Sequence, residues 1–268
     1  MDCKSTALIT GGSSGIGFEY AREFASRGYS LALVSNRPQD LRSAKEGLEQ
    51  EYGTPVHILE LDMAQDGCAD RILAWCDSLD LRVDVLVNNA GMFFMQYLGG
   101  ENLGRAGTML ALHVTAATEL SVLFGERMKQ QGGGYILIMS SMTARIPAPG
   151  IAVYSASKAY LKSFGKSFSY EMRPFGVKVT TVCPSAVDTA LYPIPDGLRK
   201  TLRRVGIIRS PQWLVRRAVR ALFRGRRCIS PGLTNILVPA LVALLPARMI
   251  DRLGIKWIAT GAADSSRR

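Results

Sequence analysis

Cysteine is scarce in this sequence, and its spacing excludes two classes of structure. Only five of the 268 residues are cysteine, an odd number that cannot be fully paired within one chain. No two of them form a CxxC or another metal-ligand spacing, which argues against a zinc site and against a disulfide framework. We therefore expect reduced cysteines that pack as small apolar residues, and a reducing, cytoplasmic compartment. The five are Cys3, Cys68, Cys76, Cys183 and Cys228.

Two kinds of apolar segment are also missing. The first residues contain no charged region followed by an apolar stretch, so the sequence predicts no secretory leader. A strongly apolar run at 236–245 is only ten residues long, whereas a helix that crosses a bilayer needs about 20. This run is suited to lie in a membrane interface but is too short to span it.

Acidic residues are absent from residues 197–250, which carry 12 of the 33 basic residues. The remaining 21 basic and 22 acidic residues nearly balance, so the positive charge is local. Within this region, residues 213–224 have the pattern of a basic amphipathic helix. Three partners fit: an anionic membrane surface, an interface with another protein chain, or nucleic acid. Nucleic acid is the least favoured because no known binding motif accompanies the charge.

Strand-like and helix-like segments alternate along the chain, which is typical of an α/β fold with a doubly wound parallel sheet. We find no internal repeat and no low-complexity linker. The sequence predicts a single domain over residues 1–230 and an apolar and basic C-terminal extension over 231–268. The predicted strands are 6–10, 30–35, 56–61, 83–87, 135–139, 177–182 and 228–230; the predicted helices are 15–27, 38–52, 109–131, 153–173 and 213–224.

The first strand is followed by a glycine-rich turn that opens the first helix. Glycines let a backbone approach a pyrophosphate closely, and the N-terminus of a helix offers free N–H donors and partial positive charge. A strand before the turn and a helix after it is the context of a dinucleotide site. The turn residues expected to bind the cofactor are Gly11, Ser13, Ser14, Gly15, Ile16 and Gly17.

A second group of polar residues surrounds the fifth strand. Ser140 and Ser141 come at the end of that strand, and Tyr154 and Lys158 are four residues apart on the helix that follows, so they share one face. A phenol has a pKa of roughly 10, and a nearby ammonium lowers it. We therefore expect Tyr154 to donate a proton and Lys158 to lower the pKa of its phenol. Ser141 would orient the substrate oxygen by a hydrogen bond.

Four motifs in register, TGxxxGxG, NNAG, a serine and YxxxK, make residues 5–190 resemble the short-chain dehydrogenase/reductase family. The resemblance implies a Rossmann fold and an oxidoreductase in which Ser141, Tyr154 and Lys158 are catalytic. Tyr154 and Lys158 would also touch the cofactor. The other residues that the resemblance places near the nucleotide are Asp62 and Met63 on the adenine side, and Asn89, Ala90, Gly91, Pro184, Val187 and Thr189 on the nicotinamide side.

The end of the second strand bears on the choice between NAD and NADP. A carboxylate at this place would bind the ribose hydroxyls and repel a 2′-phosphate, whereas an arginine would pair with the phosphate. The chain has Asn36 and Arg37 there and no acid. NADP(H) is therefore favoured over NAD(H), although the arginine of NADP-preferring relatives falls where Asn36 stands.

Two positions depart from the family pattern. His113 stands 28 residues before Ser141, where relatives carry an asparagine whose backbone holds a water of the proton relay. The imidazole either takes part in the relay, as a group whose pKa lies near neutrality, or is tolerated while the helix backbone still holds the water. Ser185 replaces the glycine of the family's PGxVxT segment.

Large apolar residues flank the expected substrate pocket, at 92–97 and 191–195. They favour a hydrophobic, lipid- or steroid-like ketone or alcohol, although such loops also pack on each other without a ligand. We predict an NADP(H)-dependent oxidoreductase that acts on such a molecule and not on a sugar, and that forms homo-oligomers as relatives commonly do. The alternative is a nucleotide-binding scaffold or redox sensor of the same fold with little turnover.

Overall fold

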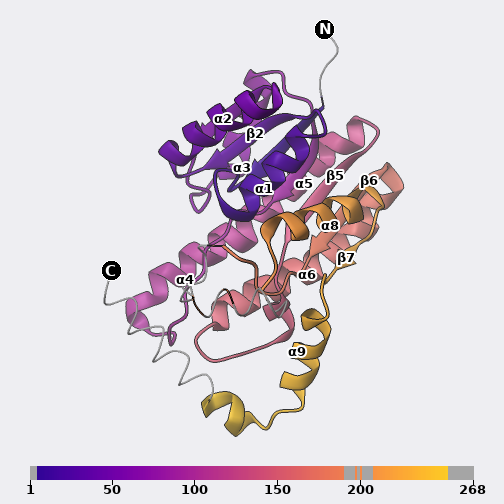
Figure 1. Ribbon diagram of the computed structural model, residues 1–268. Helices are drawn as coiled ribbons and strands as arrows, with labels where there is room; N and C mark the ends of the chain where they lie inside the picture. The colour runs from indigo at the N-terminus through magenta and orange to yellow at the C-terminus, as the bar shows by residue number, and fades with distance from the viewer. Residues whose placement is uncertain (1–4, 190–196, 198–199, 201–207, 253–268) are drawn as a thin grey trace.

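The computed structural model describes residues 5–189, 197, 200 and 208–252. Seven parallel strands form one sheet in the order β3-β2-β1-β4-β5-β6-β7. This is the doubly wound arrangement that the alternating sequence pattern predicts (Figure 1). The strands are β1 (Thr6–Thr10), β2 (Ser30–Ser35), β3 (Val56–Glu60), β4 (Val83–Asn88), β5 (Gly134–Met139), β6 (Val177–Val182) and β7 (Cys228–Ile229).

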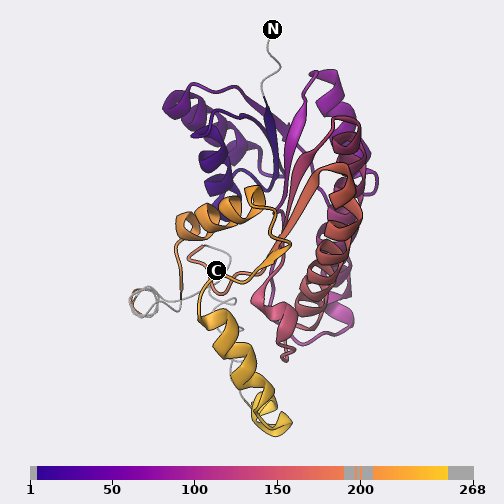
Figure 2. The ribbon, with the colours of Figure 1, turned by 90° about the vertical axis from the view of Figure 1, so that its right-hand side faces the viewer.

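Helices cover both faces of the sheet, as Figure 2 shows. One face is packed by α1 (Gly15–Ala25), α2 (Pro38–Tyr52) and α8 (Pro211–Phe223). The other is packed by α3 (Cys68–Ser78), α5 (Ala116–Gln130) and α6 (Ala152–Met172). Because both faces are covered, the strands are apolar on both sides, and β1 and β2 are buried along their whole length.

Local signals account for the helix ends. Helix α2 begins with Pro38, whose fixed φ suits the first turn, and ends at Gly53, which has a left-handed backbone with φ 60°. Helix α8 begins at Ser210, whose hydroxyl accepts a hydrogen bond from Trp213 N at 3.3 Å. Helix α6 ends where Pro174 follows, and the short helix η4 (Arg173–Phe175) leads into β6.

The segment before β5 is one long helix with a wider turn inside it. It consists of η1 (Gly100–Asn102), α4 (Leu103–Leu110), the π-helical turn η2 (Ala111–Thr115) and α5. In length and composition residues 100–130 meet the criteria for a membrane span. However, Leu120, Phe124 and Met128 are buried in the core on one face of the sheet, so we interpret this segment as a core helix.

The basic amphipathic helix predicted at 213–224 is present as α8. Its apolar residues Leu214, Val215 and Val219 are buried in the same core as helix α1, while its arginines are exposed. The apolar face is therefore covered by the protein itself and is not free for a partner.

The chain beyond β7 leaves the sheet. Helix α9 (Thr234–Ala243) extends away from the domain, and its nearest neighbour is the short helix η3 (Met142–Arg145) (Figure 2). Residues 247–252 form a further helical turn.

Candidate active site

The predicted site residues come from the carboxyl ends of neighbouring parallel strands. The turn after β1, the NNAG segment after β4, Ser141 after β5 and Pro184 after β6 all follow strands that are adjacent in the sheet. Ligands of doubly wound folds bind at this edge, where the strand order reverses between β1 and β4.

The glycine turn is shaped so that side chains are excluded from it. Gly11 has a φ of +64° and Gly15 a φ of +56°, both in the left-handed region. A Cβ on Gly17 would lie 2.0 Å from the Gly11 carbonyl oxygen, so no other residue fits there. The first N–H groups of α1 then face the edge of the sheet, and the Ser14 side chain caps none of them. These residues fit a nucleotide pyrophosphate.

Thr10 joins the glycine turn to the NNAG segment. Its hydroxyl accepts hydrogen bonds from Asn89 N at 2.9 Å and Ala90 N at 3.0 Å, and donates to Val87 O at 3.3 Å. The Asn89 side-chain amide in turn donates to Thr10 O at 3.0 Å. Thr10 is the first residue of the TGxxxGxG motif, but the sequence did not indicate that its hydroxyl joins these two segments.

Asn88, the first residue of the NNAG segment, anchors the end of β4. It is buried, and its amide donates to Ala117 O at 3.2 Å and to the Ser121 hydroxyl at 2.9 Å, both on α5. The end of β4 is thereby fixed to the long helix.

At the end of β2, Asn36 and Arg37 are both exposed, as a nucleotide-binding role requires. The Arg37 guanidinium pairs with Asp40 at 3.6 Å, and its side chain is 68% exposed. The Ser13 hydroxyl bonds to that of Ser35 at 3.0 Å, which ties the glycine turn to β2.

The residues predicted on the adenine side follow β3. Asp62 is exposed, and its carboxylate accepts the N–H of Ala64 at 3.0 Å, while Met63 is buried.

On the nicotinamide side, Pro184 and Val187 are buried and Thr189 is partly exposed. Thr189 lies opposite the glycine turn, with its methyl group 3.8 Å from where a Cβ on Gly15 would be. Asp80 is the only non-glycine residue in the described part of the chain with a positive φ, so Ser185 fits its turn without a left-handed backbone.

Ser141, Tyr154 and Lys158 are all nearly buried, at 6%, 5% and 6% exposure. The Lys158 ammonium is 5.7 Å from the centre of the Tyr154 ring. The Ser141 hydroxyl oxygen accepts the N–H of Thr143 at 3.2 Å, and this bond leaves its own hydrogen available.

Lys158 is held at the end of β5 by two bonds. Its ammonium donates to Met139 O at 3.1 Å, and its backbone carbonyl accepts the Ser140 hydroxyl at 2.7 Å. Burial lowers the pKa of Lys158 to about 8, because desolvation disfavours the ammonium.

His113 is buried in the π-helical turn and connects two segments of the site. Its Nε2 accepts the N–H of Met92 at 3.0 Å, so the neutral ring carries its hydrogen on Nδ1, which lies 3.0 Å from the Ser157 hydroxyl. Ser157 donates to Tyr154 O at 2.8 Å. Burial, with repulsion from Lys158, keeps the pKa of His113 well below its usual value. A role of its imidazole in a proton relay stays a prediction.

Apolar side chains surround the Tyr154 ring. Phe93 packs edge-on against it at 4.9 Å between ring centres, and Phe94 and Met109 belong to the same buried cluster. The segment after the NNAG motif therefore forms an apolar wall next to the phenol. The apolar segment predicted on the other side, 191–195, lies outside the described residues.

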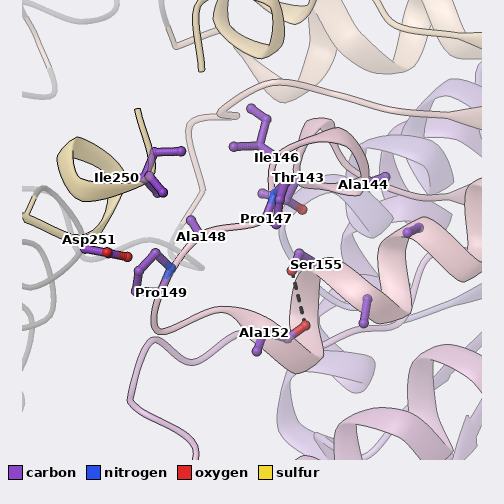
Figure 3. Close-up of a pocket in the computed structure, with 13 residues that line it drawn as sticks. Thr143, Ala144, Ile146, Pro147, Ala148, Pro149, Ala152, Ser155, Ile250 and Asp251 are labelled. Atoms are coloured by element: carbon purple, nitrogen blue, oxygen red, sulfur yellow. Dashed lines mark hydrogen bonds between the residues drawn. The ribbon is translucent and has the colours of Figure 1, made fainter. Parts of the chain in front are cut away.

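A separate apolar cavity of about 600 Å³ lies beside the first turns of α6 (Figure 3). It is lined by Thr143, Ala144 and residues 146–149, by the first turns of α6 and by the C-terminal turn with Ile250 and Asp251. None of the three predicted catalytic residues lines it, so it is not the catalytic cavity.

The comparison with protein families agrees with this geometry. The family model for short chain dehydrogenases matches residues 5–193, which is most of the chain. The chain belongs to the short-chain dehydrogenase family. It is therefore an oxidoreductase, and its sheet is the Rossmann-like sheet that we predicted from the motifs.

Two curated relatives illustrate the range of similar proteins. The type 3 17-beta-hydroxysteroid dehydrogenase of Mus musculus is 30% identical over 69% of this chain and 61% of its own length. A very-long-chain 3-oxoacyl-CoA reductase of Candida glabrata is 29% identical over 83% of this chain and 65% of its own length. The chain thus spans less than two thirds of the length of these relatives.

Two solved structures are similar over nearly their whole length. A short-chain dehydrogenase from Sphingobium yanoikuyae in complex with NADPH is 27% identical, with a TM-score of 0.75 over 91% of this chain and 97% of that chain. A bulky-bulky ketone specific alcohol dehydrogenase from Comamonas testosteroni is 27% identical, with a TM-score of 0.74 over 90% of this chain and 95% of that chain.

Proposed function

We propose that this protein uses NADP(H) to interconvert a ketone and a secondary alcohol on a hydrophobic molecule. One observation carries the proposal: Ser141, Tyr154 and Lys158 are buried together at the sheet edge that also holds the glycine turn. Asp62, Met63, Asn89, Ala90, Gly91, Pro184, Val187 and Thr189 would complete the nucleotide site.

Each of the three side chains has a distinct task in the reduction. When bound, NADPH supplies the hydride that adds to the carbonyl carbon. Tyr154 gives its phenolic proton to the carbonyl oxygen, and Ser141 donates a hydrogen bond to the same oxygen. Lys158, while charged, favours the phenolate and so lowers the cost of releasing that proton.

The preference for NADP(H) rests on the charges at the end of β2. Arg37 is exposed and paired only loosely with Asp40, so its guanidinium is able to turn toward a 2′-phosphate. The chain has no carboxylate at positions 35–37 to repel that phosphate. The NADPH-bound relative from Sphingobium yanoikuyae supports the same preference.

The proposed substrate class follows from the apolar wall of Phe93, Phe94 and Met109 next to Tyr154. The names of the relatives, which refer to a hydroxysteroid, a very-long-chain 3-oxoacyl-CoA and bulky ketones, support a lipid- or steroid-like molecule. Homo-oligomer formation, the cytoplasmic location and the division at residue 230 stay predictions.

The decisive experiment measures nucleotide binding and turnover separately. We expect NADPH to bind more tightly than NADH in a fluorescence titration, and a steroid or long-chain ketone to be reduced. Tyr154→Phe should keep NADPH binding and lower kcat by about 10²–10⁴-fold, the usual contribution of a general acid. Arg37→Ala should weaken NADPH binding about ten-fold and leave NADH binding unchanged.

The opposite results have distinct meanings. Failure to bind either nucleotide would refute the proposal. Tighter binding of NADH would refute the role of Arg37 alone. If Tyr154→Phe kept full turnover, the assignment of Tyr154 would be wrong, and if it kept the biological activity without any turnover, the protein would be a nucleotide-binding scaffold.

A further inference from the structure

Helix α9 exposes a row of leucines that no described part of the chain covers. Leu233, Leu237, Leu241 and Leu244 are 74%, 63%, 61% and 82% exposed. Their spacing of four, four and three residues puts them on one face of a helix. A row of this kind on the surface of a protein marks a contact with something apolar.

Arginines gather at both ends of this helix. At its root, Arg209 and Arg217 stack on Trp213 at 5.2 and 4.4 Å, and the Trp213 ring lies 3.8 Å from where a Cβ on Gly232 would be. Arg145 reaches the same place through a hydrogen bond to Ser230 at 3.4 Å. Beyond α9, Arg248 and Arg252 are exposed on the next helical turn.

These arginines have no acidic partners within the described chain. The ion pairs present between described residues involve arginines and lysines up to position 129 only. An exposed leucine row lies between two groups of arginines that have no acidic partner among the described residues. This arrangement is complementary to a layer with an apolar interior and a negatively charged surface.

We propose that α9 inserts its leucine row into the interface of an anionic membrane, with the arginines at its two ends bound to lipid headgroups. A second copy of the chain is less suited to this face, because two identical contacts would bring like charges together. Nucleic acid would leave the leucines exposed to water.

The same arrangement brings the apolar cavity near the bilayer. Helix α9 packs against η3, whose Thr143 and Ala144 line the cavity, and the turn at 247–252 forms its outer wall (Figure 3). The Thr143 hydroxyl oxygen is buried and has no hydrogen-bond partner among the described residues. The cavity and α9 are thus parts of one apolar surface at this end of the molecule.

The test is cosedimentation of the full chain with phosphatidylcholine vesicles that do or do not contain phosphatidylglycerol. We expect binding to the anionic vesicles, weakened by salt. Leu237→Glu with Leu241→Glu should reduce this binding at least ten-fold, and neutralising Arg248 and Arg252 with glutamine should reduce it by about five-fold per arginine. The matched control, Leu98→Glu with Leu103→Glu, adds the same charges to other exposed leucines and should bind normally.

Three results would overturn the proposal. The wild-type protein would bind no vesicle, or the Leu237 and Leu241 variant would bind as well as the wild type. In the third, this variant would turn an oligomer into a monomer in sedimentation velocity while vesicle binding stayed unchanged, which would identify a second copy as the partner. Because vesicle binding requires neither nucleotide nor turnover, its failure is distinct from failure of the proposed reaction. Equal melting temperatures of all variants would show that they are folded.

Discussion

The domain up to β6 and the region after it use the same residue types in opposite ways. In the domain, several arginines pair with carboxylates, as Arg127 does with Asp77 and Arg22 with Glu51, and leucines such as Leu33 are fully buried. After β6, the described arginines have no acidic partner, and Leu237 and Leu241 face the solvent. The domain thus buries a large apolar core and pairs part of its charge internally, whereas the described residues of α9 and its neighbours leave both leucines and arginines exposed.

Helix α8 shares one property with each of these two regions. Its leucines are buried in the sheet core like those of the domain, while its arginines are exposed and unpaired like those around α9. The change in leucine burial therefore occurs near Gly232, between the buried Leu222 and the exposed Leu233, whereas the change in arginine pairing occurs before α8.

The largest contrast should come from the same substitution at two leucines. Leu214→Ala removes a side chain buried against α1 and should lower the free energy of unfolding by about 2–5 kcal/mol. Leu237→Ala acts on an exposed side chain and should change it by less than about 0.5 kcal/mol. Chemical denaturation of both variants measures this contrast, and equal losses would mean that α9 is packed in solution.

The domain buries the Lys158 ammonium, and this burial lowers the free energy of unfolding. Its pKa of about 8 in the folded protein, against roughly 10.4 in the unfolded chain, corresponds to about 3 kcal/mol at neutral pH. Lys158→Met should therefore raise the unfolding free energy by about 1–3 kcal/mol while it abolishes turnover.

The pH dependence provides a second test of the same residue. Between pH 8 and about 10.4 the unfolded chain binds more protons at this lysine than the folded protein, so stability should rise with pH across that window. The rise should be absent in Lys158→Met. If the variant showed the same rise, another group would be its source.

The smallest contrast concerns the surface charges. Asp77→Asn breaks the two-pronged pair with Arg127 and should cost about 0.2–1 kcal/mol, because both side chains are partly exposed. Arg216→Gln removes an exposed arginine that has no acidic partner among the described residues, and it should cost nothing measurable. Thermal melts at low and high salt would compare them, and a similar loss in both would contradict the contrast.

The sheet could be predicted well because its signals are local. Strands 30–35 and 177–182 and helix 38–52 occur at the expected bounds, since apolar runs and Pro38 mark them directly. Helix α3 was missed, because its residues follow a left-handed Gly67 and have no clear N-cap signal. The long helix also begins earlier than expected, at Leu103, and continues through Gly104 and Gly107, which have low intrinsic helix propensity.

The candidate site was only partly accessible from the sequence. The order of Ser141, Tyr154 and Lys158 is a local pattern; in the structure all three side chains are buried, with the Lys158 ammonium 5.7 Å from the centre of the Tyr154 ring, and their catalytic role stays a prediction. The Thr10 hydrogen bonds, the Met92 partner of His113 and the burial of the apolar face of α8 depend on residues far apart in the chain. No periodicity in one segment indicates which distant segment covers it.

The π-helical turn at Ala111–Thr115 changes the direction in which the side chains of the long helix point. A π turn contains one more residue than an α turn, which rotates all later side chains by about 100°. Met109 before it joins the cluster around Tyr154, and Leu120 and Phe124 after it fill the sheet core. One helix thus contributes to two separate apolar layers, and the single extra residue sets the angle between them.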